Sequence, residues 1–161
     1  MLVALPSLER AASRLWSGTS TLATKQAVAT VSSTSGRAPL SVNFTGGPVT
    51  SFVWDAGLNG WVRSMDGKLH KVANGTQIAP ENVVVLETSY RTSPADAKSP
   101  EVVSVGSGKA VVLTAGKIIV GTWSRATASD KPVLKDPAGA TIALTPGRTW
   151  VEMPESGQTR Y

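Results

Sequence analysis

The sequence predicts a mainly β fold of the α+β class, with an antiparallel meander sheet, or a sandwich or partial barrel, and one N-terminal helix packed on it. Three observations support this. A hairpin pattern occupies residues 106–125, short β-rich runs alternate with turn sequences from residue 40 onward, and one amphipathic stretch lies near the N-terminus. A chain of 161 residues is long enough to bury a core within one domain.

The amphipathic stretch comes first in the chain. Ser7 can cap the start of a helix, Gly18 can end it, and the apolar residues between them recur at helical spacing. Such a stripe needs a surface to pack on, so we expect a helix over residues 7–17 that lies against the sheet. We assign residues 1–40 to this helix and an extended linker, and residues 41–161 to an antiparallel β domain.

Short strands fill the β domain and are separated by turn sequences rich in glycine, proline, asparagine and aspartate. The polar segment Tyr90–Pro100 contains two prolines and is predicted to be an exposed, mobile loop. Besides the hairpin, the predicted strands are Leu40–Phe44, Thr50–Asp55, Gly60–Met65, Lys68–Val72, Asn82–Thr88, Val133–Leu134, Thr141–Leu144 and Thr149–Met153.

The hairpin at residues 106–125 is the element around which we expect the sheet to form. A two-residue turn at Ala115–Gly116 would place Val111 opposite Val120, and Gly116 can take the positive φ that such a turn needs. Val112 and Ile119 make the second face apolar as well. The hairpin is therefore predicted to be central in a larger sheet, with both faces covered.

Composition excludes several classes of function. The chain has no cysteine, and this excludes disulfides, thiolate metal sites and cysteine nucleophiles. Its net charge of +5 comes from scattered residues, whereas nucleic-acid binding needs a clustered basic stripe, so no nucleic-acid partner is expected. No apolar run is long enough to span a bilayer, and residues 1–6 lack the pattern of a signal peptide. No spacing indicates a metal site or a cofactor.

The best candidate site is a group of aromatic and basic residues on one hairpin. Asp66–Gly67 predicts a type I′ turn, and the resulting register places Arg63 opposite His70. Trp61 then shares their face, and a four-residue loop before it would add Trp54. Indole rings stack on sugars or cations and a guanidinium binds carboxylate or phosphate, so these four residues are a candidate ligand-binding face.

Two alternatives stay open for this group. The tryptophans can instead belong to the core, with Arg63 stacked on one of them. A five-residue loop would bring Asp55 onto the face, and His70, the single histidine, could then act as a base with Asp55 or Asp66. The sequence offers no further part of a catalytic mechanism, so we assign no catalytic residue beyond this candidate role of His70.

Several motifs, taken in order, resemble the C-terminal domain of the YerB-like bacterial proteins, a family of unknown function (DUF3048) usually described as lipoproteins. The resemblance covers about residues 44–161, and its most specific parts are the GTWSR motif and the run that contains PGRTW. The motifs are FVWD (52–55), WVR (61–63), DGKLH (66–70), NVVV (82–85), GSGKA (106–110), GTWSR (121–125) and LTPGRTWV (144–151).

The resemblance implies an extracytoplasmic protein that is associated with the membrane through an upstream region. It also implies that residues 1–40 are the tail of a larger N-terminal domain that this chain lacks. It brings no catalytic residue and no cofactor. Because Trp123 lies within GTWSR, we expect the hairpin to add it to the candidate site if it emerges beside Trp54 and Trp61.

Three functions follow from these expectations. The first is a non-catalytic envelope module that binds a ligand or partner, such as cell-wall glycan or a protein. The second is a hydrolase of envelope polymers with His70 as the base. The third is a structural domain that supports the missing N-terminal domain, which would itself be the partner; this role predicts an exposed apolar patch.

Overall fold

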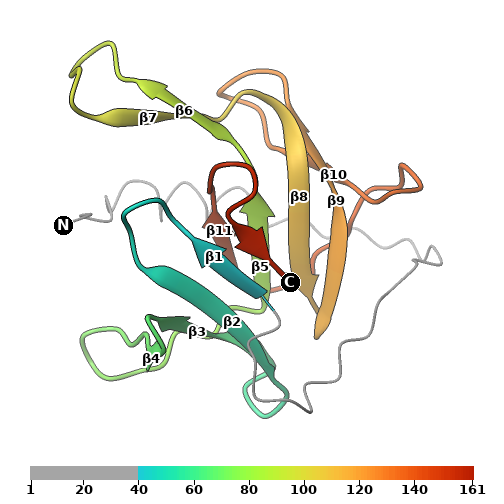
Figure 1. Cartoon of the computed structure of the whole chain (residues 1–161). Helices are drawn as coiled ribbons and strands as arrows, with labels where there is room; N and C mark the ends of the chain where they lie inside the picture. The colour runs from blue at the N-terminus through green and yellow to red at the C-terminus, as the bar shows by residue number, and fades with distance from the viewer. Residues whose placement is uncertain (1–39) are drawn as a thin grey trace.

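The computed structural model of the chain describes residues 40–161, which form twelve strands in three sheets (Figure 1). The helix predicted at residues 7–17 lies outside the described residues. The strands are β1 (Leu40–Asn43), β2 (Val49–Asp55), β3 (Gly60–Met65), β4 (Lys68–Leu69), β5 (Asn82–Leu86), β6 (Ser89–Thr92), β7 (Pro100–Val103), β8 (Gly106–Thr114), β9 (Lys117–Arg125), β10 (Val133–Lys135), β11 (Thr149–Glu152) and β12 (Thr159–Arg160).

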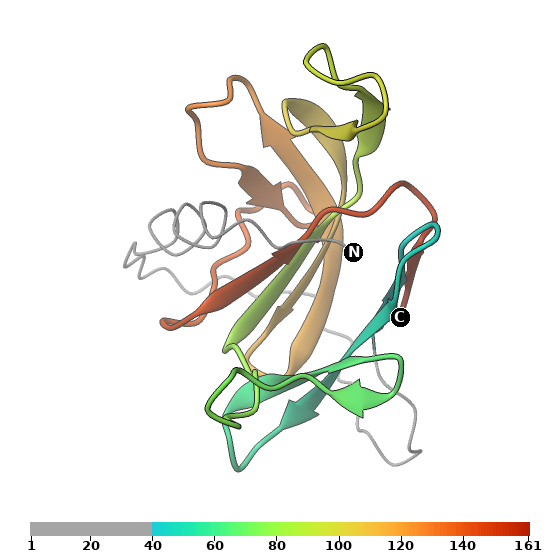
Figure 2. The same cartoon turned by 90° about the vertical axis from the view of Figure 1, so that its left-hand side faces the viewer.

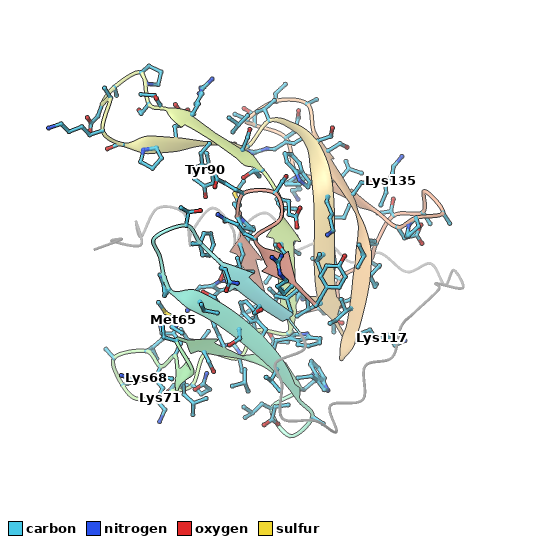
Figure 3. All side chains as sticks on the ribbon, in the orientation of Figure 1. Met65, Lys68, Lys71, Tyr90, Lys117 and Lys135 are labelled. Carbon is cyan, nitrogen blue, oxygen red and sulfur yellow. The ribbon has the colours of Figure 1, made fainter. Side chains whose placement is uncertain are left out.

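The front sheet has the strand order β12-β1-β2-β3-β4 and is antiparallel throughout. Its β3–β4 turn is the predicted one: Asp66 and Gly67 both have positive φ, and Met65 pairs with Lys68. Figure 3 labels Met65 and Lys68 beside this turn. The inward side chains of β1 to β3 are buried, apart from the half-buried Trp54 and Met65, and the outward ones are not, as expected for a sheet with one covered face.

The central sheet has the order β10-β9-β8-β5-β11. The predicted hairpin forms its middle, with Val111 opposite Val120 and positive φ at both Ala115 and Gly116. The prediction that both faces are covered is confirmed, because Val111 and Leu113 belong to one apolar cluster and Val112 to another.

The predicted mainly β class is confirmed over residues 40–161, and the expected antiparallel pairing holds for every pair of strands but one. The exception is β11, which pairs with β5 in parallel, with Trp150 opposite Val83. The chain reaches this parallel position after a long excursion through β8, β9 and β10. Thr141–Leu144 is not a strand: Thr141 makes one isolated bridge to Lys135, while Ile142 and Leu144 cover the outer apolar cluster.

The segment predicted as a loop at residues 90–100 is partly strand: it includes most of β6, and β7 begins at its last residue, Pro100. β6 and β7 pair with each other to form an arm that projects from the body, and Tyr90 lies at its base (Figures 1 and 3). The Tyr90 hydroxyl donates a hydrogen bond of 2.6 Å to the carbonyl oxygen of Met153. Burial is the first cause of a raised pKa for Tyr90, so this hydroxyl stays protonated at neutral pH.

Two apolar clusters hold the layers together. The inner cluster lies between the front and central sheets, which Figure 2 shows as separate layers, and includes Leu40, Phe52, Trp61 and Val111. The outer cluster lies on the opposite face of the central sheet and includes Trp123 and Leu134. Each cluster removes apolar surface from water, which is the main favourable term in folding.

Candidate functional site

The structure brings together four of the five candidate residues in the predicted register. Trp54 is opposite Trp61, as the four-residue loop requires, and the backbone N–H of His70 bonds the carbonyl of Arg63 at 3.0 Å. After His70 the chain moves away from β3, and the segment that ends at Pro80 takes over as the hydrogen-bonding neighbour of β3. The N–H of Trp61 bonds the carbonyl of Pro80 at 2.8 Å. The alternative with Asp55 on this face is therefore wrong.

The two tryptophans of this hairpin belong largely to the core. Trp61 is 1% exposed in the inner cluster, and its ring centroid lies 5.2 Å from that of Trp54, at an interplanar angle of 59°. Trp54 is half-buried and packs on the β8–β9 turn: a Cβ atom on Gly116 would lie 3.0 Å from its indole nitrogen. The central hairpin thus meets the candidate site through its turn.

Arg63 is the centre of the group. Its side chain is 8% exposed, and one terminal nitrogen, Nη2, lies 3.3 Å from the Thr50 hydroxyl and 3.4 Å from a Glu152 carboxylate oxygen. The other, Nη1, contacts Nδ1 of His70. The guanidinium carbon lies 4.5 Å from the ring centroid of Trp150, within the range of a cation–π contact.

Glu152 and Trp150 are site residues that sequence reasoning did not identify. Both project from β11 toward the inner cluster because they pair with Val85 and Val83 of β5. The indole N–H of Trp150 donates a hydrogen bond of 2.9 Å to Glu152. The PGRTW motif was a usable signal, but only the parallel pairing of β11 places these residues beside Arg63, which lies in the other sheet.

The Arg63–Glu152 pair is an ion pair between the two sheets. Burial raises the pKa of Glu152, and the Arg63 charge and the Trp150 hydrogen bond oppose that rise. Burial also lowers the pKa of Arg63, against the attraction of Glu152. Each charge therefore depends on the other, since a single buried charge is costly. We call Thr50, Arg63, His70, Trp150 and Glu152 the clamp.

His70 lies at the half-buried edge of the clamp. An arginine has only donors, so Nδ1 of His70 faces Arg63 as the acceptor. The ring also meets Trp150 edge-on, with a centroid distance of 6.2 Å. The two carboxylates considered as its catalytic partners accept backbone hydrogen bonds: Asp55 accepts the N–H of Leu58 within its turn, and Asp66 accepts that of Val49 at the start of β2.

Trp123 does not lie beside Trp54 and Trp61, so the expectation that the hairpin adds it to the site is wrong. It points to the opposite face of the central sheet and is 2% exposed in the outer cluster. Its indole N–H donates a hydrogen bond of 2.9 Å to the carbonyl of Glu87. Gly108 allows this close approach, because a Cβ atom there would lie 2.7 Å from the indole nitrogen.

Replacing Trp123 with phenylalanine is expected to lower the free energy of unfolding by about 1–3 kcal/mol, because the buried carbonyl of Glu87 loses its donor. Urea denaturation measures the loss. The matched control is Trp54→Phe, since Trp54 is half-buried and phenylalanine preserves its ring contact. An unchanged stability of the Trp123→Phe variant would contradict the structural role of this hydrogen bond.

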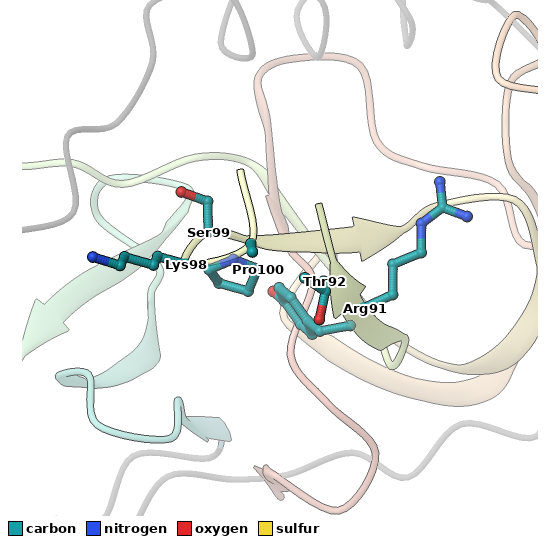
Figure 4. A pocket seen from close by; sticks show the side chains of 7 residues that line it. Arg91, Thr92, Lys98, Ser99 and Pro100 are labelled. Carbon is teal, nitrogen blue, oxygen red and sulfur yellow. The ribbon is translucent and has the colours of Figure 1, made fainter. Parts of the chain in front are cut away.

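The arm carries a shallow hollow along the β6–β7 pair (Figure 4). Tyr90, Thr92 and Pro100 lie on one face of the β6–β7 pair, while Arg91 points away from them and bonds Glu101 at 3.0 Å. The hollow is lined by Tyr90, Arg91, Thr92, Ala97, Lys98, Ser99 and Pro100. These side chains are mostly exposed, so the hollow offers little enclosure to a small molecule.

Within residues 40–161, no group of three or more histidine, cysteine or acidic residues could hold a metal ion. Over the same residues, no helix has the length and apolarity needed to cross a membrane.

Comparison with known proteins adds a family and a fold. The family model described as "Protein of unknown function (DUF3048) C-terminal domain" matches residues 40–151. The crystal structure of YerB protein from Bacillus subtilis is similar to the chain, with a TM-score of 0.62 and 19% identity, over 78% of this chain and 44% of that one. The chain thus spans less than half the length of that protein. No curated protein matches the sequence.

Proposed function

The chain belongs to the DUF3048 C-terminal domain family, and from this premise we propose that it is a non-catalytic module of the bacterial cell envelope that binds a protein partner. The resemblance expected from the motifs is confirmed by the family match and by the YerB-like fold. The chain corresponds to 44% of the YerB chain, so the remaining part of such a chain is a natural binding partner for it.

The clamp is the observation that carries this proposal. The ionisable side chains of the clamp meet at Arg63, which lies between the two sheets. Its guanidinium contacts both His70 and Glu152 and is largely buried. A ligand would have to break the Arg63–Glu152 pair to use either charge, and breaking a buried pair costs several kcal/mol. The clamp therefore suits a role in holding the two sheets together, and recognition falls to the outer surfaces.

The burial of the tryptophans argues against a glycan ligand. Stacking on a sugar needs an accessible indole face, yet Trp61 and Trp123 are 1% and 2% exposed. Trp54 and Trp150, both half-buried, have the remaining indole surface of the inner cluster. A protein partner requires no such cleft, because flat sheet surfaces are sufficient for protein association.

Replacing His70 with alanine tests the hydrolase alternative. Purified full chain and the His70→Ala variant are incubated with peptidoglycan, and soluble sugar and peptide fragments are measured. We expect no release of fragments by either protein, because a carboxylate oxygen of Asp55 and one of Asp66 already accept backbone N–H groups, those of Leu58 and Val49. Release that the substitution abolishes would overturn the proposal in favour of a hydrolase.

Sedimentation of the full chain with the same peptidoglycan separates a glycan ligand from a protein partner. We expect the chain to stay in the supernatant. Sedimentation that the Trp54→Ala variant lacks would overturn the protein partner, because that substitution removes an accessible indole. The His70→Ala variant is the control here, since it leaves the indole rings of both sheets in place.

A further inference from the structure

The outer face of the front sheet is unusually free of charge. Two cross-strand rows define its centre. In the first, Ser41 pairs with Ser51 and Ser51 with Ser64; in the second, Val53 pairs with Val62. Because opposite residues in paired strands project to the same side, these side chains form one continuous surface.

Exposed apolar residues and then charged residues surround the centre of this face. Leu69 continues the serine row at one side and is 57% exposed, while Val49, 42% exposed, lies next to Asn43. Charge appears only at the margins of the described face, with Arg160 ending the serine row on β12. An uncharged centre with a charged margin is the pattern of a protein interface rather than of a solvated sheet face.

The central sheet provides a comparison within the same molecule. Its inner face is covered by the front sheet and its outer face by residues around Leu134 and Ile142. The front sheet has the inner cluster on one side only, and its outward residue Val53 is 36% exposed. Figure 1 shows β1, β2 and β3 lying in front of β5 and β11, with nothing of residues 40–161 drawn across them.

We infer that this face is the docking surface for the domain that precedes β1 in longer members of the family, an inference that rests on the proposed function. The family match begins at residue 40, which is the first residue of β1, and the matched unit is a C-terminal domain. A preceding domain therefore joins the chain directly at the front sheet. The solved YerB chain has more than half its length outside the similarity, which leaves room for such a domain.

The chemistry of the face determines what the partner must offer. Valine, leucine and serine side chains on a sheet give no cation for a phosphate and no aromatic ring for a sugar. They fit a flat partner surface of small apolar and hydroxyl side chains, packed as one sheet or helix against another. The docking surface of the preceding domain is accordingly expected to be uncharged at its centre.

Replacing Val53 with lysine tests this inference. The probe is the part of Bacillus subtilis YerB that precedes its similarity to this chain, produced separately and immobilised for biolayer interferometry. We expect the full chain to bind it, and Val53→Lys to weaken binding at least about tenfold by placing a charge at the centre of the interface. The matched control is Val133→Lys on β10, which alters a comparably exposed valine, 44% against 36%, of the other sheet.

Each outcome distinguishes this inference from the proposed function. Failure of the full chain to bind the probe, unchanged binding by Val53→Lys, or equal weakening by Val133→Lys would overturn it. Self-association of the full chain that Val53→Lys abolishes would assign the face to a second copy and also overturn it. Unfolding curves of both variants are recorded first, because an exposed valine on a strand should tolerate lysine. Only the peptidoglycan assays can overturn the non-catalytic function itself.

Discussion

Replacing Arg63 with methionine should lower the free energy of unfolding by about 3–5 kcal/mol, because it leaves the Glu152 carboxylate buried without its cation. Methionine preserves much of the side-chain volume, so the loss reports mainly on charge. Urea denaturation at neutral pH measures it. The same substitution at Arg91, whose partner Glu101 is also exposed, should leave the unfolding midpoint nearly unchanged.

The double variant Arg63→Met/Glu152→Gln identifies the cause of that loss. Glutamine is neutral but keeps an oxygen that can accept the indole N–H of Trp150. We expect the double variant to recover more than half of the lost stability. A double variant as unstable as the single one would show that packing, rather than the unpaired carboxylate, accounts for the effect.

The loss at Arg63 should also depend on pH. Burial already raises the pKa of Glu152 in the folded protein, and removal of the Arg63 charge raises it further. The folded state then binds more protons than the unfolded state between the two pKa values, so stability falls as pH rises through that window. The Arg63→Met variant is therefore expected to lose less stability at about pH 5 than at about pH 8.

Replacing Gly121 with alanine is expected to lower the free energy of unfolding by about 1–3 kcal/mol, as overpacking of a core does. An added Cβ atom would lie 2.0 Å from the carbonyl oxygen of Lys135 and 3.0 Å from its carbonyl carbon. Both are backbone atoms, so β10 has to move away from β9. Urea denaturation measures the stability, and amide exchange of Leu134 reports whether β10 has separated.

The matched control for Gly121 is Gly57→Ala. A Cβ atom at Gly57 would meet only a carboxylate oxygen of Asp55, at 3.2 Å, and a shift of a few tenths of an ångström in that side chain accommodates it. The control should stay close to the wild-type stability. If Gly121→Ala were equally stable, the close approach of β10 to β9 would be contradicted.

The local part of the fold could be predicted from the sequence. Ala115–Gly116 and Asp66–Gly67 each specify a tight turn, and a turn of known length fixes which residues face each other. The pairing of Arg63 with His70 followed from that rule alone, whereas the pairing of Trp54 with Trp61 was one of two alternatives set by the length of the loop between them. These predictions needed only contacts between neighbours in the chain.

The long-range part could not be predicted. Glu152 lies 89 residues beyond Arg63, and nothing in the periodicity around PGRTW indicates that β11 joins β5 in parallel. Trp123 was assigned to the wrong face because the register of its hairpin does not show which sheet face the front sheet covers. The family resemblance identified the motifs along the chain, but it gave no information on which motifs contact one another in the folded protein.

The short strand β12 has a consequence for how the protein folds. It returns from the end of β11 to complete the front sheet, where Arg160 pairs with Ser41. The first and last strands of the described chain are thus neighbours, and such distant contacts slow folding because a long loop must close before they form. During synthesis, β1 has an unpaired edge until residues 159–160 leave the ribosome, so a nascent chain exposes that edge to other strands or to chaperones.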